Sequence, residues 1–286
     1  MDFIKGLTDR TVFIVGSKKN AGKTTFLNYA MSRLRGSTRL AALSIGVDGE
    51  ACDQIFGNPK PQVRVEAGDL LLCADTSLKN SDLSFDILNV YPFCTALGRP
   101  LLLRARRRGK AEISGPENNP QLAEILADMR RHGAGTVFID GAVDRITQAA
   151  EGGNASLVYV AKVEPENLIS SASALKLLWA ASRAPLWKPG SKSREPVLFA
   201  EGALTAGKIP PKNEKGTLVI EDPTKLFLSW QEWQALNARM DVRFTRRPDL
   251  AAFIVNLYNI SRADFEKNLA LPALAERIIY NPYALG

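Results

Sequence analysis

Histidine and cysteine are scarce in this chain of 286 residues, and their scarcity excludes several kinds of catalytic site. His132 is the only histidine, which argues against a zinc site built on several histidines and against a Ser-His-Asp triad. It follows Arg130-Arg131 and precedes Gly133, a pattern typical of a helix C-terminus, where a cation complements the helix dipole. The three cysteines (Cys52, Cys73, Cys94) are an odd number and form no C-x-x-C pair. We therefore expect reduced thiols in a cytoplasmic protein and no disulfide scaffold.

Long apolar runs are also missing. No run approaches the roughly 18 to 20 residues that a membrane span requires. Residues 1–10 mix acids and bases without an apolar stretch, so we expect neither a secretory signal nor a membrane partner. With 45% hydrophobic and 23% charged residues, the composition is that of a globular protein with one large domain or two smaller ones.

Positive charge is in excess, with a formal net charge of +7. The densest cluster, Arg104 to Lys110, follows Leu101-Leu102-Leu103 and predicts the end of a strand that turns at Gly109. No aromatic residues are interleaved with it, and no nucleic-acid-binding signature accompanies it, so we do not expect nucleic acid as a partner. Two interpretations stay open: a solvated strand edge, or a docking patch for an acidic partner.

The most informative segment runs from Val12 to Thr25. A short apolar run leads into a turn that ends in Gly22-Lys23-Thr24-Thr25, and a helix-forming segment follows. This layout predicts a P-loop, in which backbone N–H groups surround phosphates, the lysine reaches the β- and γ-phosphates and the threonine hydroxyl binds Mg²⁺. The predicted nucleotide-binding residues are Ser17, Lys18, Lys19, Asn20, Ala21, Gly22, Lys23, Thr24 and Thr25.

The P-loop pattern is shifted at its first glycine. The usual spacing is G-x-x-x-x-G-K-[ST], but Ser17 holds the place of the first glycine and Gly16 lies one residue earlier. In the following helix, Leu27, Ala30, Met31 and Leu34 fall on one face. The context of strand, turn and amphipathic helix favours the nucleotide-binding interpretation over a plain turn.

Acidic residues are expected at the same end of the sheet. Residues 39–45 predict a second, parallel strand that ends before Asp48 and Glu50, and residues 136–139 predict a buried strand that ends at Asp140. We expect Asp140 to hold Mg²⁺ directly or through water, with Thr24, Asp48 and Glu50 as further candidate ligands. The guanine signature Asn-Lys-x-Asp is absent from the sequence, which favours ATP.

Three residues are candidate catalytic groups: Lys23 for the charge that develops on the phosphoryl group, Asp48 to orient water, and Lys18. Lys18 lies five residues before Lys23, the spacing of deviant K-G-G-x-G-K-T loops, in which such a lysine reaches the partner's nucleotide across a homodimer. Its alternative role is only to raise the positive potential of the loop. Asp48 precedes Gly49 and has a turn residue as its alternative interpretation.

The predicted fold is α/β, a doubly wound and mainly parallel sheet with helices on both faces. Residues 58–116 contain short strand-like pieces and few helical periods, so we expect a β-rich insertion that binds a partner. Residues 1–57 and 117–286 would then form the P-loop nucleotide-binding domain. Asn119-Pro120 predicts the start of the next helix, with Asn119 as its N-cap and Leu122, Ile125, Leu126 and Met129 as its buried stripe.

Several segments together resemble one family. They are residues 16–25, residues 44–50, Gly115-Pro116 with Asn119 and Gln121-Leu122, and residues 138–141. The chain resembles the P-loop subunit of the lysine 5,6-aminomutase reactivase family over roughly residues 10–150. More broadly, the loop is similar to the class that contains dethiobiotin synthetase, which shares its spacing.

The resemblance implies a Mg²⁺-dependent ATPase that acts with a second, MutS-like subunit to release damaged cofactor from an adenosylcobalamin-dependent aminomutase. The family's loop residues correspond to Gly22, Lys23 and Thr24, and its strand-end acids to Asp48 and Asp140. Two alternatives remain: an ATP-dependent ligase of the dethiobiotin synthetase type, and a nucleotide-gated protein that binds nucleic acid through residues 104–110.

Overall fold

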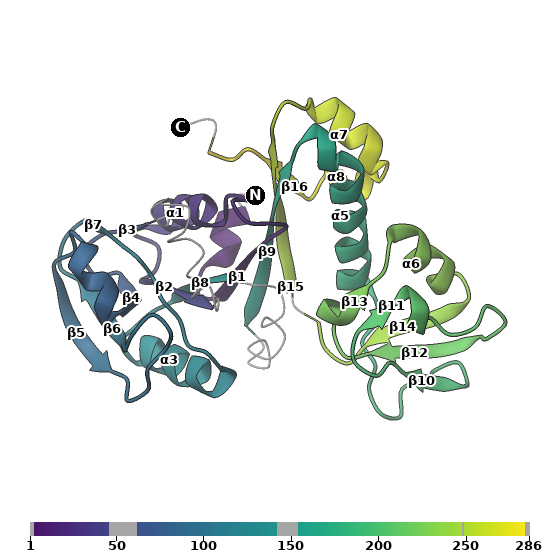
Figure 1. The fold of residues 1–286 in the computed structure, drawn as a ribbon, viewed down its shortest axis with the longest axis horizontal. Helices are drawn as coiled ribbons and strands as arrows, with labels where there is room; N and C mark the ends of the chain where they lie inside the picture. Colours follow the sequence, from purple (N-terminus) through teal and green to yellow (C-terminus); the bar gives the residue numbers. More distant parts are fainter. Residues whose placement is uncertain (1–2, 46–61, 142–153, 248, 284–286) are drawn as a thin grey trace. The chain divides into compact units, whose positions relative to one another are not determined.

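A computed structural model describes residues 3–45, 62–141, 154–247 and 249–283 (Figure 1). The chain divides into two compact units: unit 1 comprises Met1–Val160 with Pro282–Gly286, and unit 2 comprises Ala161–Asn281. This division does not coincide with the boundaries expected after residues 57 and 116. Asp48, Glu50 and the remainder of residues 46–61 lie outside the described part of the chain.

Unit 1 is built on a mostly parallel sheet flanked by helices, which confirms the predicted α/β class. The order of its strands is β9-β1-β8-β2-β4-β6-β5. The first four neighbouring pairs are parallel, and the pairs β4/β6 and β6/β5 are antiparallel. The strands of this sheet are β1 (Thr11–Gly16), β2 (Leu40–Ile45), β4 (Leu70–Ala74), β5 (Phe85–Val90), β6 (Pro100–Ala105), β8 (Thr136–Gly141) and β9 (Ala155–Val163).

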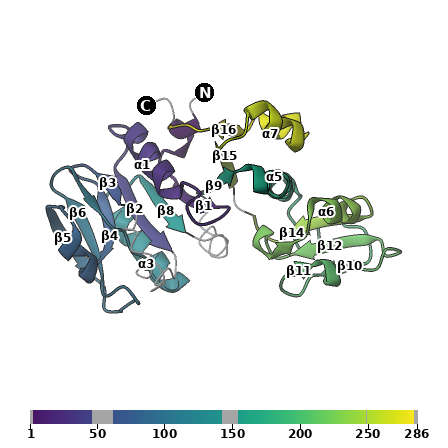
Figure 2. The ribbon, with the colours of Figure 1, turned by 45° about the horizontal axis from the view of Figure 1, so that its top comes forward.

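Two helices lie on opposite sides of this sheet, as Figures 1 and 2 show. Helix α1 (Lys23–Leu34) buries Phe26 and the four apolar residues expected from the sequence. Helix α3 (Asn119–Arg131) begins one residue earlier than predicted, because the N-cap is Asn118, whose side chain accepts a hydrogen bond from the backbone N–H of Gln121. Its buried stripe includes Asp128, while Leu126 is only half-buried. Short 3-10 helices, η1 (Phe3–Leu7) and η2 (Asp75–Asn80), complete the described helical part of unit 1.

The segment expected to stand apart as an insertion instead extends the central sheet. Strand β4 pairs with β2, and β6 lies between β4 and β5. The arginine cluster therefore follows an internal strand and not a solvated edge strand, because the edge of the sheet is β5. Separately, β3 (Val63–Val65) and β7 (Gly109–Ala111) form a two-stranded antiparallel ribbon.

Unit 2 has its own small parallel sheet, in the order β10-β12-β14. Trp233 of α6 stacks on Phe244 of β14, with ring centroids 6.4 Å apart. Trp233 and Phe244 belong to the hydrophobic core of this part of unit 2, and the end of α5 packs on that core through Ala181 and Ala184. The elements of this part are α5 (Leu168–Arg183), β10 (Val197–Phe199), β11 (Leu204–Thr205), β12 (Gly216–Ile220), β13 (Leu226–Phe227), α6 (Trp230–Asn237) and β14 (Met240–Phe244).

Strand β9 passes through the division between the units, so its last residues lie in unit 2, beside β15. The remaining elements of unit 2 are β15 (Asp249–Leu257), α7 (Arg262–Leu269), α8 (Pro272–Ala275) and β16 (Ile278–Tyr280), with the short 3-10 helices η5 (Pro165–Asn167), η6 (Ala206–Lys208) and η7 (Pro223–Lys225). Within the described residues, no helix combines the length and the apolar character needed to cross a bilayer.

Candidate functional site

The predicted phosphate-binding loop connects the end of β1 to the start of α1. Its backbone is fixed at both ends: Ser17 N–H donates to the Val160 carbonyl of β9 at 2.9 Å, and Phe26 N–H donates to the Gly22 carbonyl at 2.9 Å. Asn20 and Gly22 adopt positive φ angles, 59° and 99°. The loop is therefore a defined turn, in which the left-handed conformation of Gly22 favours glycine over other residues.

The N-terminus of α1 lacks the usual side-chain cap. Gly22 is its N-cap residue and has no side chain to accept hydrogen bonds from the first turn. The first N–H groups of a helix need an acceptor from outside the helix, and together with the helix dipole they favour an anion. Thr24 is half-buried, and Ser17, Lys18, Lys19, Asn20 and Thr25 are exposed, so most of the loop is accessible to a ligand.

The packing around residue 16 explains why it is a glycine. A Cβ atom at this position would lie 3.0 Å from Cγ of Lys23 and 3.1 Å from Cδ. It would also lie 3.3 Å from Cβ of Ala21. The aliphatic part of Lys23 thus folds back over the end of β1, and the glycine leaves room for it. Although this glycine lies one residue before the usual first glycine of a P-loop, it leaves space for the Lys23 side chain.

Thr24 and Asp140 are brought together although 116 positions separate them in the sequence. Asp140 lies at the carboxyl end of β8, opposite Ile14 on one side and Ser44 on the other. Thr24 Oγ1 and Asp140 Oδ2 are 2.9 Å apart. An ionised carboxylate only accepts hydrogen bonds, so the Thr24 hydroxyl donates and keeps its lone pairs for another partner. The structure thus brings together two of the four candidate Mg²⁺ ligands, Thr24 and Asp140.

Gly115 and Gly141 pack closely against the end of β2. A Cβ atom on Gly115 would lie 1.5 Å from the Ser44 carbonyl oxygen, and one on Gly141 would lie 2.6 Å from the Ile45 carbonyl oxygen. Ser114 joins two strands, because its carbonyl accepts from Ser44 N–H and its N–H donates to the Leu72 carbonyl, both at 2.8 Å. Residues 114 and 115 therefore insert where β2 and β4 diverge. The sequence singled out Gly115 only through the resemblance, and nothing in the local pattern predicted this role for Ser114.

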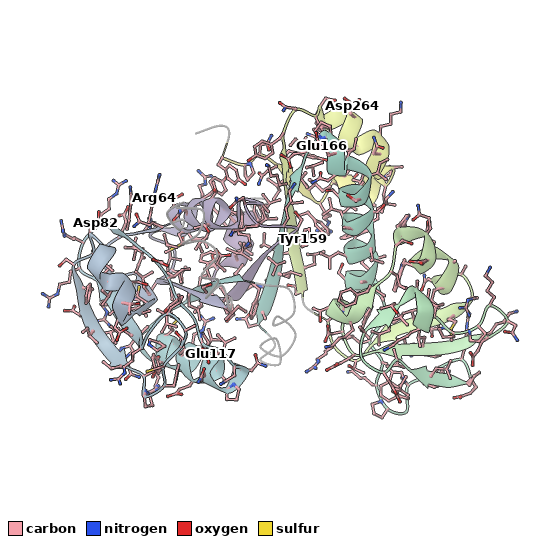
Figure 3. The ribbon with its side chains drawn as sticks, in the orientation of Figure 1. Arg64, Asp82, Glu117, Tyr159, Glu166 and Asp264 are labelled. Carbon is pink, nitrogen blue, oxygen red and sulfur yellow. The ribbon has the colours of Figure 1, made fainter. Side chains whose placement is uncertain are left out.

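Tyr159 lies on β9 opposite Val15, beside the strand that leads into the loop (Figure 3). Burial raises the pKa of its phenol. The phenol is therefore neutral at pH 7 and unsuited to act as a general base.

The described residues contain no cluster of three or more His, Cys, Asp or Glu side chains that could bind a metal by themselves. Thr24 and Asp140 supply two oxygen groups at one point. Such a pair suits Mg²⁺, which keeps several waters and binds through one or two protein groups together with substrate phosphates. Asp48 and Glu50, the other two predicted ligands, fall in residues 46–61, so the structure does not place them.

No protein-family model matches the chain, and no curated protein matches it.

Proposed function

We propose that the chain is a Mg²⁺-dependent nucleoside triphosphatase whose site lies between the loop at residues 16–25 and Asp140. The observation that carries the proposal is the hydrogen bond between Thr24 and Asp140. It joins the threonine that directly follows Lys23 to an acid at the end of β8, the parallel neighbour of β1. P-loop enzymes hold Mg²⁺ with a threonine and a strand-end aspartate placed in this way.

Each residue has a defined task in this proposal. The N–H groups at the start of α1 would bind phosphate oxygens, and Lys23 would place its ammonium group against the β- and γ-phosphates. Asp140 orients the Thr24 hydroxyl by accepting a hydrogen bond from it. A Mg²⁺ ion held by Thr24 and, directly or through water, by Asp140 would neutralise charge on the phosphate oxygens.

We propose ATP as the nucleotide, and a reactivating role toward an adenosylcobalamin-dependent aminomutase together with a second, MutS-like subunit. Support for this role comes from the resemblance of residues 16–25, 44–50, 115–122 and 138–141 to the reactivase family. The close packing of Gly115 against Ser44 gives one of those motifs a physical task at the same edge of the sheet.

Hydrolysis of ATP and GTP by the full chain tests the proposal. We expect Mg²⁺-dependent ATP hydrolysis in the wild type and a loss of about a hundredfold or more in Lys23→Ala, because a preorganised charge is removed from the phosphoryl group. Lys5→Ala is the matched control, since Lys5 is an exposed lysine of the same unit outside the loop. Equal rates in wild type and Lys23→Ala would overturn the proposal.

The reactivating role needs a second measurement. A candidate mutase inactivated with damaged cofactor should recover activity with the chain, its MutS-like partner and ATP, and should not recover with Lys23→Ala. Hydrolysis that no protein changes, together with no recovery, would contradict this role and leave the hydrolase intact.

A further inference from the structure

Four exposed cations lie on and beside the β3–β7 ribbon. Figure 1 shows this ribbon at the end of unit 1 opposite β9, and Figure 3 labels one of the cations, Arg64. We call them the basic ribbon: Arg64, Arg107, Arg108 and Lys110. In the part of the chain that the structure describes, none of their side chains forms an ion pair with a carboxylate. Arg106 differs, because its guanidinium pairs with Asp86.

Two of these cations are held side by side. Arg64 lies directly opposite Lys110 in the antiparallel ribbon. The alternate residues Val63, Val65 and Ala111 are buried, so Arg64 and Lys110 occupy the exposed face. Like charges directly opposite each other destabilise a strand pair. The ribbon therefore keeps an arrangement that costs free energy in the isolated chain.

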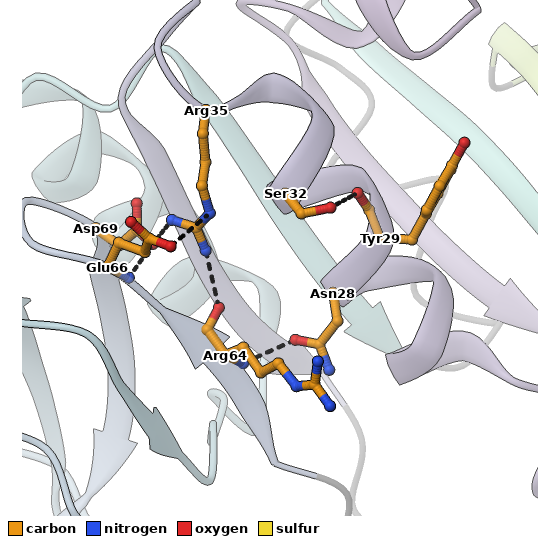
Figure 4. A network of polar contacts seen from close by, with 7 residues as sticks. All are labelled: Asn28, Tyr29, Ser32, Arg35, Arg64, Glu66 and Asp69. Atoms are coloured by element: carbon orange, nitrogen blue, oxygen red, sulfur yellow. Dashed lines mark hydrogen bonds and ion pairs between the residues drawn. The ribbon is translucent and has the colours of Figure 1, made fainter. Parts of the chain in front are cut away.

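Other side chains fix the backbone at this pair of cations, and Figure 4 shows the contacts at Arg64. The Asn28 amide oxygen accepts from Arg64 N–H at 2.7 Å, and Arg35 donates to the Arg64 carbonyl at 3.1 Å. On the other strand, the Asp82 carboxylate accepts from Lys110 N–H at 2.6 Å. Rigid backbone positions keep the two charges together before any ligand binds, which lowers the cost of binding.

Two exposed aliphatic side chains lie on the strand beside β6. Ile87 and Val90 are 54% and 48% exposed, and both lie on β5, the edge strand that pairs with β6 just before the arginine turn. In the described part of unit 1 they are the exposed large hydrophobic residues, and neither is aromatic. Bases of single-stranded nucleic acid stack on aromatic side chains. A cationic rim beside exposed aliphatic groups instead suits a protein interface.

We propose that the basic ribbon and the exposed residues of β5 form a docking surface for a partner protein that presents carboxylates around aliphatic side chains. Charge complementarity selects the carboxylates, and Ile87 with Val90 selects the aliphatic groups. Arg64 joins this surface only through strand pairing, because 42 intervening residues separate it from Arg107 in the sequence. The inference does not depend on the nucleotide site.

Binding of fluorescent probes by the full chain tests the proposal. The probes are an alternating Glu–Leu peptide, polyglutamate, and a DNA duplex, all of equal formal charge. The variants are Arg64→Glu with Lys110→Glu, Arg107→Glu with Arg108→Glu, and Ile87→Ser with Val90→Ser. Lys212→Glu with Lys215→Glu is the matched control, since it changes net charge equally at exposed residues of unit 2.

We expect the Glu–Leu peptide to bind most tightly, and each charge-reversal pair to weaken it by about tenfold or more. The serine pair should weaken the Glu–Leu peptide and leave polyglutamate unchanged, while the control pair changes neither by more than about twofold. An equal loss in the control pair would reduce the effect to net charge and overturn the proposal. DNA binding tighter than the peptide, with a steep loss of affinity in salt, would overturn it in favour of nucleic acid.

Discussion

Helix α1 in unit 1 and helix α6 in unit 2 both follow strands of parallel pairs, but they begin in opposite ways. In α6, Ser229 Oγ accepts from Glu232 N–H at 3.2 Å and the Glu232 carboxylate accepts from Ser229 N–H at 2.7 Å. This capping box satisfies the helix terminus from within the chain. In α1, Gly22 supplies no side chain at the same position. The chain caps the start of α6 with its own side chains and places no side-chain cap at the start of α1.

Helices α3 and α7 follow the pattern of α6. Asn118 caps α3, and Ser261 caps α7 by accepting from Asp264 N–H at 3.0 Å. Helices α5 and α8, like α1, begin without a side-chain cap, at Asn167 and Leu271. What sets α1 apart from these two is that three lysines lie between residues 18 and 23. In the proposed function, the uncapped N–H groups at the start of α1 and the Lys23 ammonium group would both bind phosphate oxygens.

The largest effect should come from breaking the hydrogen bond between Thr24 and Asp140. Thr24→Ala removes the hydroxyl bound to Asp140 and a proposed Mg²⁺ ligand. We expect ATP hydrolysis to fall by about a hundredfold or more. The matched change in the closed helix is Ser229→Ala, which should leave hydrolysis unchanged. Steady-state phosphate release measures both, and equal losses in the two variants would break the comparison.

Next in size is Gly115→Ala, which tests the packing beside the site. The new Cβ would lie 1.5 Å from the Ser44 carbonyl oxygen, so the strand end must move. We expect a loss of about 3 kcal/mol in the free energy of unfolding. Gly207→Ala in unit 2 is the control, because a Cβ there meets no atom within 4 Å. Urea unfolding followed by circular dichroism compares the two, and equal costs would contradict the close approach.

A smaller effect is expected from removing the cap of α6. Ser229→Ala should lower the free energy of unfolding by about 1 kcal/mol, since one N-terminal donor loses its acceptor. Hydrogen bonds from the backbone N–H and the hydroxyl of Ser229 hold the pKa of the Glu232 carboxyl below its ordinary value of 4.5. The contribution of Glu232 is therefore present above pH 4.5 and is lost as the pH falls through the lowered pKa. Glu232→Gln should accordingly lose its stability difference from wild type in acid, and a difference that grows in acid would refute this account of the cap.

The smallest effect concerns Lys18. If it only raises the positive potential of the loop, Lys18→Ala should weaken ATP binding by less than about tenfold, and by less still at high salt. If it reaches a partner's nucleotide, the hydrolysis rate per chain should rise with protein concentration in wild type and not in Lys18→Ala. Rates measured across a dilution series separate the two roles.

Much of unit 1 could be predicted from the sequence, because its signals are local. The apolar run before Gly16, the amphipathic face of α1 and the strand that ends at Asp140 each lie within one element. The ends of β1 and β8 lie at one edge of the sheet because the strands are parallel, and this is the edge at which ligands of such sheets bind. The contact between Thr24 and Asp140 was therefore within reach of sequence reasoning.

The extension of the central sheet by residues 70–105 could not be predicted from the sequence. Short apolar strands such as Leu70–Ala74 carry no information on which neighbour they pair with, so a separate insertion and an extended sheet look alike in the sequence. The same limit hid the pairing of Arg64 with Lys110 and the insertion of Ser114 between β2 and β4. Long-range pairing decided each of these cases, and local patterns do not encode it.

The central claim is that the open terminus of α1 binds a nucleoside triphosphate, and calorimetric titration of the full chain with ATP tests it most directly. We expect saturable binding that requires Mg²⁺, disappears in Lys23→Ala and is unaltered in Ser229→Ala. Absence of binding to wild type with either ATP or GTP, or identical heats for wild type and Lys23→Ala, would contradict it.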